Sequence, residues 1–439
     1  MLFTLALVFS YVAVVEERPP VLRAAVMTAI VVLGGFFFRR LELLKSAAVA
    51  ALILLIAKPL ALRDSSFQLT FVAIGCIAGL AVHWLEKTVQ PYVRALRGWK
   101  DITRDAAHEP RATQFRIDLR SLERWVTARM PQALGNVTGY GLAGGLSLTF
   151  RIWELLVVTL ALQIGMLPLM ARNFHRSSLS APAVNLVAVP AVGFLVPLRF
   201  LTLTTGLTLP AVGKFLAAPL TWLTNVLIRF VYWFGHVPRW SYRIPGPPLW
   251  LIVTFFAFGT GLAAAMRIAL ARWKLLGRGV CFAWLACALV IAVFPFAPTW
   301  SRGKLEVSVL DVGQGDSLFV VSPGGKTMLI DGGGAFGGYA MQETSFGIDP
   351  GEEAVSPYLW SRGFQKLDVV ALTHAHQDHL GGLSAILENF HIGKLWIGRE
   401  VSSPALARLE QLAKNRGIPI EHKLRGKSFD WDGVKAEFL

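Results

Sequence analysis

The sequence predicts a polytopic α-helical membrane protein followed by a smaller α/β domain, and three observations lead to this fold class. Of the 439 residues, 54% are hydrophobic and only 16% are charged, and the mean hydropathy is +0.52. The charge is divided unevenly, because residues 1–300 hold 29 Lys and Arg against 11 Asp and Glu, whereas residues 301–439 hold 14 against 17. Strand-like runs begin only after residue 300. This composition excludes a soluble globular enzyme, a disulfide scaffold and a disordered basic tail.

Residues 1–300 contain several runs that suit a bilayer, whose hydrocarbon core needs about 20 apolar residues per helix. The clearest uncharged runs are Phe67–Leu85 with 19 residues, Leu249–Met266 with 18 and Gly279–Trp300 with 22. Shorter or proline-interrupted runs are Ala24–Phe38, Ala47–Leu62, Val157–Ala171 and Ala183–Leu198. We therefore expect a transmembrane domain over residues 1–300 with about eight to ten spans.

The N-terminal run Met1–Val15 and the apolar stretch Phe200–Phe234 need separate treatment. Met1–Val15 lacks the basic start and the small-residue cleavage site of a signal peptide, so we expect a first, short span. Lys214 and Arg229 leave the number of spans in Phe200–Phe234 open.

A basic segment near residues 86–150 interrupts the apolar pattern. Phe115, Leu119, Leu122 and Trp125 follow one another at offsets of four, three and three residues. This spacing predicts one apolar stripe on an amphipathic helix that lies along the membrane surface. The basic face of the helix suits anionic lipid or a nucleic acid, and lipid is the commoner partner of such helices.

Basic loops predict the orientation of the spans, because Lys and Arg gather on the cytoplasmic side. Clusters occur at Arg39–Lys45, in the segment near residues 86–150, and between Arg267 and Arg278. We expect these three loops to be cytoplasmic. The span that begins at Gly279 would then carry residues 301–439 to the extracytoplasmic side.

The sequence after Trp300 predicts a sheet with helices. Aliphatic and β-branched runs separated by Gly-rich turns indicate short strands, and two later segments have helical spacing. The expected strands are Leu305–Leu310, Ser317–Val321, Thr327–Ile330, Asp368–Thr373 and Lys394–Ile397, and the expected helices are Leu383–Glu388 and Pro404–Lys414. This order is typical of an α/β sandwich.

One short segment of this domain carries the side chains of a metal site. His374, His376, Asp378 and His379 lie directly after the strand Asp368–Thr373 and before Gly381-Gly382. Imidazole nitrogen and carboxylate oxygen hold Zn²⁺ or Mn²⁺ with positions left open for water. We expect His374 and His376 on one side of the turn and Asp378 and His379 on the other, so that two metals are served. Two adjacent metals would activate a bound water and clamp a phosphate or acyl group.

The segment His374–His379 resembles the HxHxDH signature of the metallo-β-lactamase superfamily. Three further segments agree with the resemblance: Asp311–Ser317, Leu329–Gly334 and Pro357–Gly363. The combination is similar to the C-terminal domain of the ComEC family of bacterial DNA-uptake proteins. The membrane part also resembles that family, in Arg23–Met27, in Asp64–Phe71, and in the order of Gln163, Pro168, Phe174, Asn185 and Pro190.

This resemblance implies a competence-type membrane domain in a bacterial inner membrane and a metallo-β-lactamase-like αββα domain with two metals. It implies catalytic roles for Asp378 and Asp331, with Asp331 as a supporting carboxylate near the site, although a turn-forming Asp is nearly as good an explanation. The segment that contains Asp311, Gly313, Gln314, Gly315 and Asp316 should form a tight turn close to the metal loop. Arg23, Gln68, Gln163 and Asn185 are channel candidates, and packing between helices is as good an explanation for the buried amides.

The resemblance also marks two departures. Members of the family usually have a soluble module and further helices before the segment that Arg23–Met27 resembles, so the chain is expected to be truncated at both ends. In the superfamily a third ligand of the first metal, a bridging carboxylate and a final histidine come later than Leu439. We therefore expect the metallo-β-lactamase-like domain of residues 301–439 to be incomplete, with weak metal binding and little hydrolase activity.

Three functions remain open from the sequence. The first is a channel component that passes single-stranded DNA through the membrane in natural transformation, with a nuclease-like tail and with DNA-receptor and cytoplasmic motor proteins as partners. A motor is expected outside the chain because the sequence has no G-x-x-x-x-G-K segment. The second is a membrane-anchored metallohydrolase acting on a substrate other than DNA. The third is an inactive partial gene product. The oligomeric state is left open.

Overall fold

The computed structural model describes residues 2–14, 19–36, 43–129, 135–235, 237, 240–268, 271–334, 349–398, 403–423 and 426–437. The chain divides into two compact units. The first contains Met1–Leu169, Ser178–Tyr242 and Leu249–Leu289, and the second contains Met170–Ser177, Arg243–Pro248 and Val290–Leu439. The basic loop at Arg39 and Arg40 lies outside the described residues.

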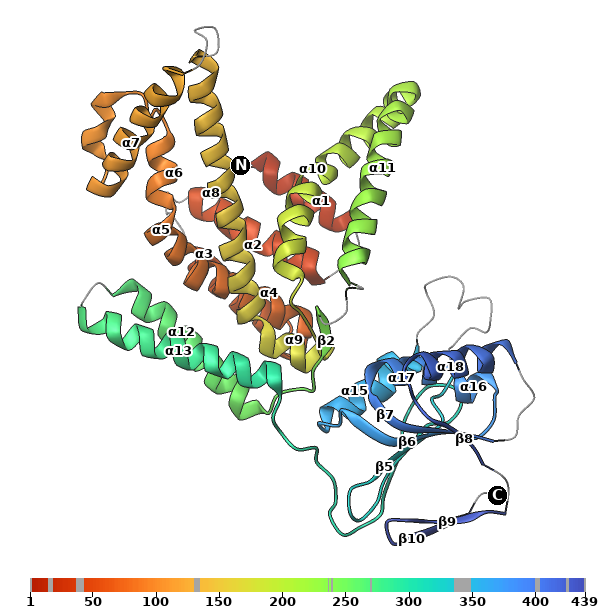
Figure 1. Cartoon of the computed structure of the whole chain (residues 1–439). Helices are drawn as coiled ribbons and strands as arrows, with labels where there is room; N and C mark the ends of the chain where they lie inside the picture. Colours follow the sequence, from red (N-terminus) through yellow and green to blue (C-terminus); the bar gives the residue numbers. More distant parts are fainter. Residues whose placement is uncertain are drawn as a thin grey trace. The chain divides into compact units, whose positions relative to one another are not determined.

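The first unit is helical (Figure 1). Its N-terminal helices are α1 (Leu2–Val14), α2 (Pro19–Phe36), α3 (Leu43–Ala57), α4 (Ser65–Cys76), α5 (Val82–Thr88), α6 (Gln90–Leu96) and α7 (Pro110–Thr127). Its later helices are α8 (Gly135–Gly165), α10 (Ala181–Thr208), α11 (Pro210–Gly235), α12 (Leu249–Arg267) and α13 (Ala271–Val293), and α9 (Leu167–Phe174) passes from the first unit into the second.

Within the described residues, six helices are long and apolar enough to cross a membrane. They are Ser65–Thr88, Thr138–Gly165, Ala181–Thr208, Pro210–Gly235, Leu249–Arg267 and Leu275–Val293. Two shorter apolar helices, Pro19–Gly35 and Leu43–Ala57, precede them. The chain is a multi-pass membrane protein, and the number of eight to ten spans stays a prediction.

Proline positions explain where the observed spans differ from the uncharged runs of the sequence. The predicted run Val157–Ala171 is divided, because α8 ends at Gly165 and α9 begins at Leu167, with Pro168 in its first turn. Pro190 and Pro197 lie inside α10 instead of ending it. Membrane helices tolerate such prolines where neighbours satisfy the freed carbonyl groups. The stretch after Phe200 forms the end of α10 and all of α11, so it is part of one helical hairpin.

The segment near residues 86–150 contains the predicted amphipathic helix, but its stripe is divided between two environments. In α7, Leu119 is buried and Phe115 packs edge-on against Tyr92, with ring centroids 5.4 Å apart. Leu122 and Trp125 are instead exposed, by 45% and 57%. The four apolar residues thus lie on one helix, as predicted, and the position of this helix along the membrane surface stays a prediction.

A charged residue, Arg116, also lies on the buried face of α7. Arg116 is fully buried, and its guanidinium donates to the carbonyl oxygens of Ala95 at 2.8 Å, Gly98 at 2.9 Å and Asp101 at 2.7 Å. Its Nε also lies 2.6 Å from Oδ1 of Asp105. These bonds hold α7 against the preceding loop.

The second unit contains one six-stranded sheet in the order β3-β4-β5-β6-β7-β8. Its strands are β3 (Glu306–Val309), β4 (Leu318–Val321), β5 (Thr327–Ile330), β6 (Lys366–Leu372), β7 (His391–Ile397) and β8 (Ile420–His422). The first three strands form an antiparallel meander, and β5 to β8 are parallel. In Figure 1, the helices α15 (Ser356–Ser361), α16 (Gln377–Leu380), α17 (Leu383–Asn389) and α18 (Pro404–Asn415) lie over one face of this sheet.

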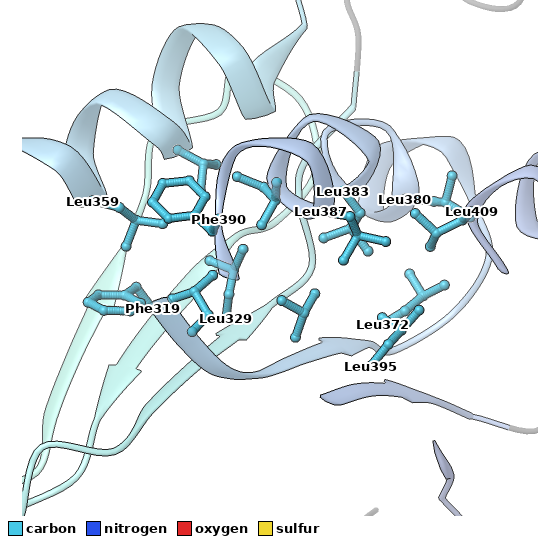
Figure 2. Close-up of a cluster of buried hydrophobic side chains, with 14 of the residues drawn as sticks. Phe319, Leu329, Leu359, Leu372, Leu380, Leu383, Leu387, Phe390, Leu395 and Leu409 are labelled. Carbon is cyan, nitrogen blue, oxygen red and sulfur yellow. The ribbon is translucent and has the colours of Figure 1, made fainter. Parts of the chain in front are cut away.

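The main core of this unit lies between the sheet and its helices. Figure 2 shows Phe319, Leu329 and Leu395 from the strands facing Leu383, Leu387 and Leu409 from the helices. All except Leu409 are among the largest fully buried side chains, and Leu409 is itself 0% exposed. Burial of each leucine contributes about 2 kcal/mol, so this layer holds the edge of the sheet in a fixed position.

The opposite face of the sheet carries a smaller layer. Strands β9 (Ser428–Trp431) and β10 (Val434–Glu437) form an antiparallel hairpin. Trp431 of the hairpin joins Met328, Val369 and Trp396 of the sheet in one apolar cluster. The two faces of the sheet are therefore both covered in part, as the predicted sandwich requires.

The C-terminal unit confirms the predicted strands and helices, with ends that shift by at most three residues. The sequence analysis did not predict α15 and the turn of helix before it, α16, or the three strands β8 to β10. Two chain segments from the helical part also belong to this unit. Arg243, in one of them, donates from Nη2 to Oε2 of Glu352 at 2.6 Å.

Candidate metal centre

The candidate metal centre lies where two neighbouring parallel strands end. Residues 328–330 of β5 pair in register with residues 369–371 of β6. Asp331 follows the end of β5, and Thr373 and His374 follow the end of β6. Because parallel strands end at the same edge of a sheet, these side chains come together, and ligands commonly bind at this edge.

Three of the predicted ligands meet within a radius that suits one cation. Ligand atoms of His374, His376 and Asp378 all lie within 4.8 Å of one another. The rings of His374 and His376 have centroids 4.7 Å apart. Two neutral imidazoles and one carboxylate are a donor set for Zn²⁺ or Mn²⁺, with room for water as a further ligand. These residues fit a metal ion.

The predicted division of the ligands between two sides of the turn differs from the structure. Asp378 was expected on the other side of the turn from His374 and His376, but its carboxylate lies beside these two histidines. The physical reason is α16, which begins at Gln377 and turns Asp378 back toward the histidines. His379 lies close by, with Nε2 3.6 Å from Oδ2 of Asp378 and its ring centroid 4.0 Å from that of His374.

Asp331 supports two of the histidines and does not join the ligand cluster. Its Oδ2 atom lies 2.8 Å from Nδ1 of His379 and accepts from the hydroxyl of Thr373 at 2.6 Å, while Oδ1 accepts from the Thr373 amide at 2.8 Å. Asp331 is 2% exposed and has a φ of 60°. These hydrogen bonds satisfy a buried carboxylate. Asp331 is therefore a positioning residue, which favours the supporting role over a turn-forming one.

Thr373 is a site residue that the sequence analysis did not single out. Its hydroxyl lies 3.0 Å from Nδ1 of His374 while it also donates to Asp331. The position directly before the first histidine, at the end of a buried strand, was the signal that could have identified it. Thr373 and Asp331 thus contact the Nδ1 atoms of His374 and His379, and orient the two rings as outer partners of metal ligands commonly do.

Two Gly-rich turns pack against the metal loop. Gly315 has a φ of +79°, and a Cβ at this position would lie 1.7 Å from the backbone oxygen of Asp378. Gly334 is similarly close, since its Cβ would lie 2.6 Å from Cα of Asp378. The amide of Gly334 donates to the oxygen of Gln314 at 2.8 Å, which joins the two turns. The predicted tight turn near the metal loop is confirmed.

The polar side chains of that first turn play a different part from the ligands. Asp311 accepts a hydrogen bond from the amide of Gly313 at 3.2 Å, and the backbone oxygen of Asp316 accepts from Gly333 at 3.0 Å. Both aspartates are exposed. Among the described residues, neither belongs to the group whose ligand atoms lie within 4.8 Å of one another.

The four channel candidates lie on helices of the first unit, and three of them form bonds within the chain. Arg23 is 4% exposed, lies 3.6 Å from Oδ2 of Asp64 and donates to the hydroxyl of Ser66. The amides of Gln68 and Gln163 donate to the backbone oxygens of Leu62 at 3.0 Å and Ser178 at 2.9 Å. Asn185 is half-buried on α10. These contacts favour packing between α2 and α4 for Arg23, whereas Gln163 joins α8 to the short strand β1 (Arg176–Ser178).

The fold and the site together define a multi-pass membrane protein that carries a metallo-β-lactamase-type domain. The family of competence proteins matches residues 1–270, and the metallo-beta-lactamase superfamily matches residues 310–438. Since the first match covers more than half of the chain, the chain belongs to the competence protein family. This finding confirms the family resemblance and the fold class expected from the sequence.

Three curated relatives are similar to the chain. ComE operon protein 3 of Bacillus subtilis (strain 168) is 29% identical over 279 residues, which cover 62% of this chain and 35% of the relative. The uncharacterized protein YcaI of Escherichia coli (strain K12) is 25% identical over 298 residues, which cover 64% of this chain and 32% of the relative. Competence protein ComA of Neisseria gonorrhoeae is 25% identical over 276 residues, which cover 62% of this chain and 33% of the relative. The chain thus spans about a third of the length of these relatives.

Proposed function

We propose that this protein is an inner-membrane channel component that takes up single-stranded DNA in natural transformation. The observation that carries the proposal is the match of residues 1–270 to the competence protein family. Six long apolar helices support it, because a simple anchor for a metal domain needs one or two spans. The basic excess of residues 1–300 also suits a polyanionic substrate.

The metal domain would cleave DNA, either the strand that is degraded during uptake or the end of the strand that passes through the membrane. A bound Zn²⁺ or Mn²⁺ would polarise a phosphate oxygen and lower the pKa of a bound water. The chain itself would hold the cation with His374, His376 and Asp378. It would fix the ring of His379 through Asp331. Three side chains around one cation position leave further positions to water, and the expectation from the sequence of weak metal binding and low hydrolase activity in this chain is part of the proposal.

Partners and topology complete the proposal. Single-stranded DNA is the substrate, a DNA-receptor protein would deliver it, and a cytoplasmic motor would draw it inward. The C-terminal unit would lie on the extracytoplasmic side, as the basic loops before α13 favour.

The test of the transport proposal is a deletion of the gene in a naturally competent host, followed by uptake of radiolabelled DNA. Loss of internalised label, with restoration by the intact gene, is the expected outcome. A mutant that internalises as much label as its parent would contradict the proposal. Complementation with the double variant His374→Ala/His376→Ala then separates the metal centre from the membrane helices.

A membrane-anchored metallohydrolase that acts on another substrate is the second candidate, and the donor set of the metal centre is the observation that favours it. If the first proposal holds, any hydrolysis by the purified protein with Mn²⁺ or Zn²⁺ should be slow cleavage of end-labelled single-stranded DNA, and His376→Ala should remove it. Hydrolysis of a lipid or cell-wall ester without cleavage of DNA would favour the second candidate.

A further inference from the structure

The helical hairpin of α10 and α11 carries a groove that the transport proposal does not use. It encloses about 740 Å³ and is lined by side chains of both helices. The two helices meet closely beside it, since a Cβ on Gly213 would lie 2.4 Å from Cα of Gly206. Most of the side chains of both helices are exposed, so the rest of the chain leaves this surface open.

Two cations line this groove, and neither has an acidic partner among the described residues. Arg199 of α10 and Lys214 of α11 are both exposed lining residues. Within the described residues, neither one has a salt bridge or a side-chain hydrogen bond. The sequence explains why, because residues 155–305 contain no Asp or Glu at all. An anion that neutralises both charges must therefore come from outside this part of the chain.

The remainder of the groove is apolar. Leu203, Leu207 and Leu220 are typical of the lining, and the third polar side chain, Thr202, donates its hydroxyl to the oxygen of Leu198 at 2.7 Å. The groove thus offers two positive charges and an apolar wall, but few free hydrogen-bonding groups. This combination suits a ligand with an anionic head and a hydrocarbon tail.

Helix geometry places Lys214 near the level of the lipid headgroups and Arg199 one to two helical turns deeper. Arg199 lies nine residues before the end of α10 and Lys214 four residues after the start of α11, about 14 Å and 6 Å from the turn along the helices. A helix of 28 residues is about 42 Å long and extends about 6 Å beyond each side of a 30 Å hydrocarbon core. Lys214 then lies at the boundary with its side chain leaning toward the turn, and Arg199 lines the same groove from about 8 Å deeper.

We propose that this groove binds an anionic phospholipid, with the phosphate between Arg199 and Lys214 and an acyl chain along the apolar wall. The exposed apolar surface of the hairpin favours lipid over a DNA strand, because bases would have to lie against acyl chains without partners for their polar edges. A bound lipid of this kind would fix the hairpin at one depth in the membrane.

The proposal is tested on the full-length protein by native mass spectrometry in an uncharged detergent, with phosphatidylglycerol or phosphatidylcholine added at equal concentration. We expect the protein to bind phosphatidylglycerol preferentially. Each cation near an anionic lipid contributes about fivefold in affinity, so Arg199→Gln/Lys214→Gln should lower this preference by about 25-fold. Arg229→Gln/Arg278→Gln is the matched control, since it removes two exposed charges that do not line the groove.

Each outcome decides the proposal. An equal loss of preference in both double variants would overturn it, since net charge alone would then explain binding. Retention of the preference in Arg199→Gln/Lys214→Gln would overturn it as well, and so would a preference for a short oligothymidylate over phosphatidylglycerol at these two residues. If the double variant does not fold, Arg199→Lys/Lys214→Arg should keep the preference, whereas Lys214→Gln alone should lower it.

Discussion

Nδ1 of His379 lies 2.8 Å from Oδ2 of Asp331, which also accepts the hydroxyl of Thr373. This carboxylate is almost fully buried at the end of β5, whereas both of its partners follow β6. The relationship joins two strands at the metal centre. It determines which ring nitrogen of His379 remains for a cation, since the other nitrogen is occupied by the carboxylate.

Asp331→Asn should lower the affinity of the centre for Zn²⁺ by about 10- to 100-fold, because outer partners of metal ligands orient them and raise their basicity. Competition with a zinc-binding dye on the full-length protein measures the effect. Asp316→Asn is the control, because its side chain is exposed near the same turn. Equal Zn²⁺ affinity in the two variants would show that Asp331 does not position the ligands.

Thr373→Val should also weaken metal binding, by about tenfold, because a charge-assisted hydrogen bond is lost and a buried carboxylate keeps one acceptor unpaired. Thr373→Ser retains the hydroxyl and should bind Zn²⁺ nearly as the parent does. The same dye competition distinguishes the two. A loss of Zn²⁺ affinity in Thr373→Ser as large as that in Thr373→Val would contradict the hydrogen-bonding role, because only the serine variant keeps the hydroxyl.

Gly315→Ala should destabilise the C-terminal unit by more than about 2 kcal/mol, since the new Cβ would meet the oxygen of Asp378 at 1.7 Å and the φ is +79°. Gly303→Ala separates the two causes, because Gly303 has a φ of +74° and nothing within 4 Å. It should cost only about 1 kcal/mol. Thermal unfolding followed by circular dichroism compares them, and equal losses would exclude the close contact as a cause.

Arg116→Met should destabilise the helical unit by about 3 kcal/mol, because several carbonyl oxygens around a buried guanidinium lose their donor. Arg124→Met on the exposed side of the same helix should change stability by less than about 0.5 kcal/mol. Unfolding of both variants in the same detergent tests this expectation. A small effect of Arg116→Met would mean that water replaces the guanidinium.

Glu421 predicts a pH dependence at the edge strand β8. Hydrogen bonds from Lys394 and Lys423 lower the pKa of its carboxyl to about 2 from an ordinary value of 4.5. A carboxyl whose pKa is lowered by folding stabilises the folded state at pH values above the pKa that it has in the unfolded chain. This stabilisation is lost as pH falls from about 4.5 toward 2.

Glu421→Gln should therefore be less stable than the parent at pH 7, by up to about 1 kcal/mol for this partly exposed pair. The difference should shrink as pH falls below about 4.5. Thermal unfolding across this pH range measures it. Glu437→Gln, at another exposed carboxylate, should show no such trend, and a difference at Glu421 that does not depend on pH would contradict the ion pair.

Hydropathy and short-range spacing in the sequence determined much of the fold of this protein. Uncharged runs such as Leu249–Met266 predicted spans, and β-branched runs such as Thr327–Ile330 predicted strands, because burial of a helix or strand leaves a local periodic signal. The four side chains from His374 to His379 were identified in the same way, since metal ligands of one loop are close in sequence.

The tertiary structure decided what depends on residues far apart in the chain. Asp331 and His379 are 48 positions apart, and only the parallel pairing of β5 with β6 makes one the partner of the other. The burial of Arg116 in place of an apolar side chain, and the meeting of Arg199 with Lys214 in one groove, have the same origin. Local spacing carries no information on such contacts, because they arise when separate elements pack together.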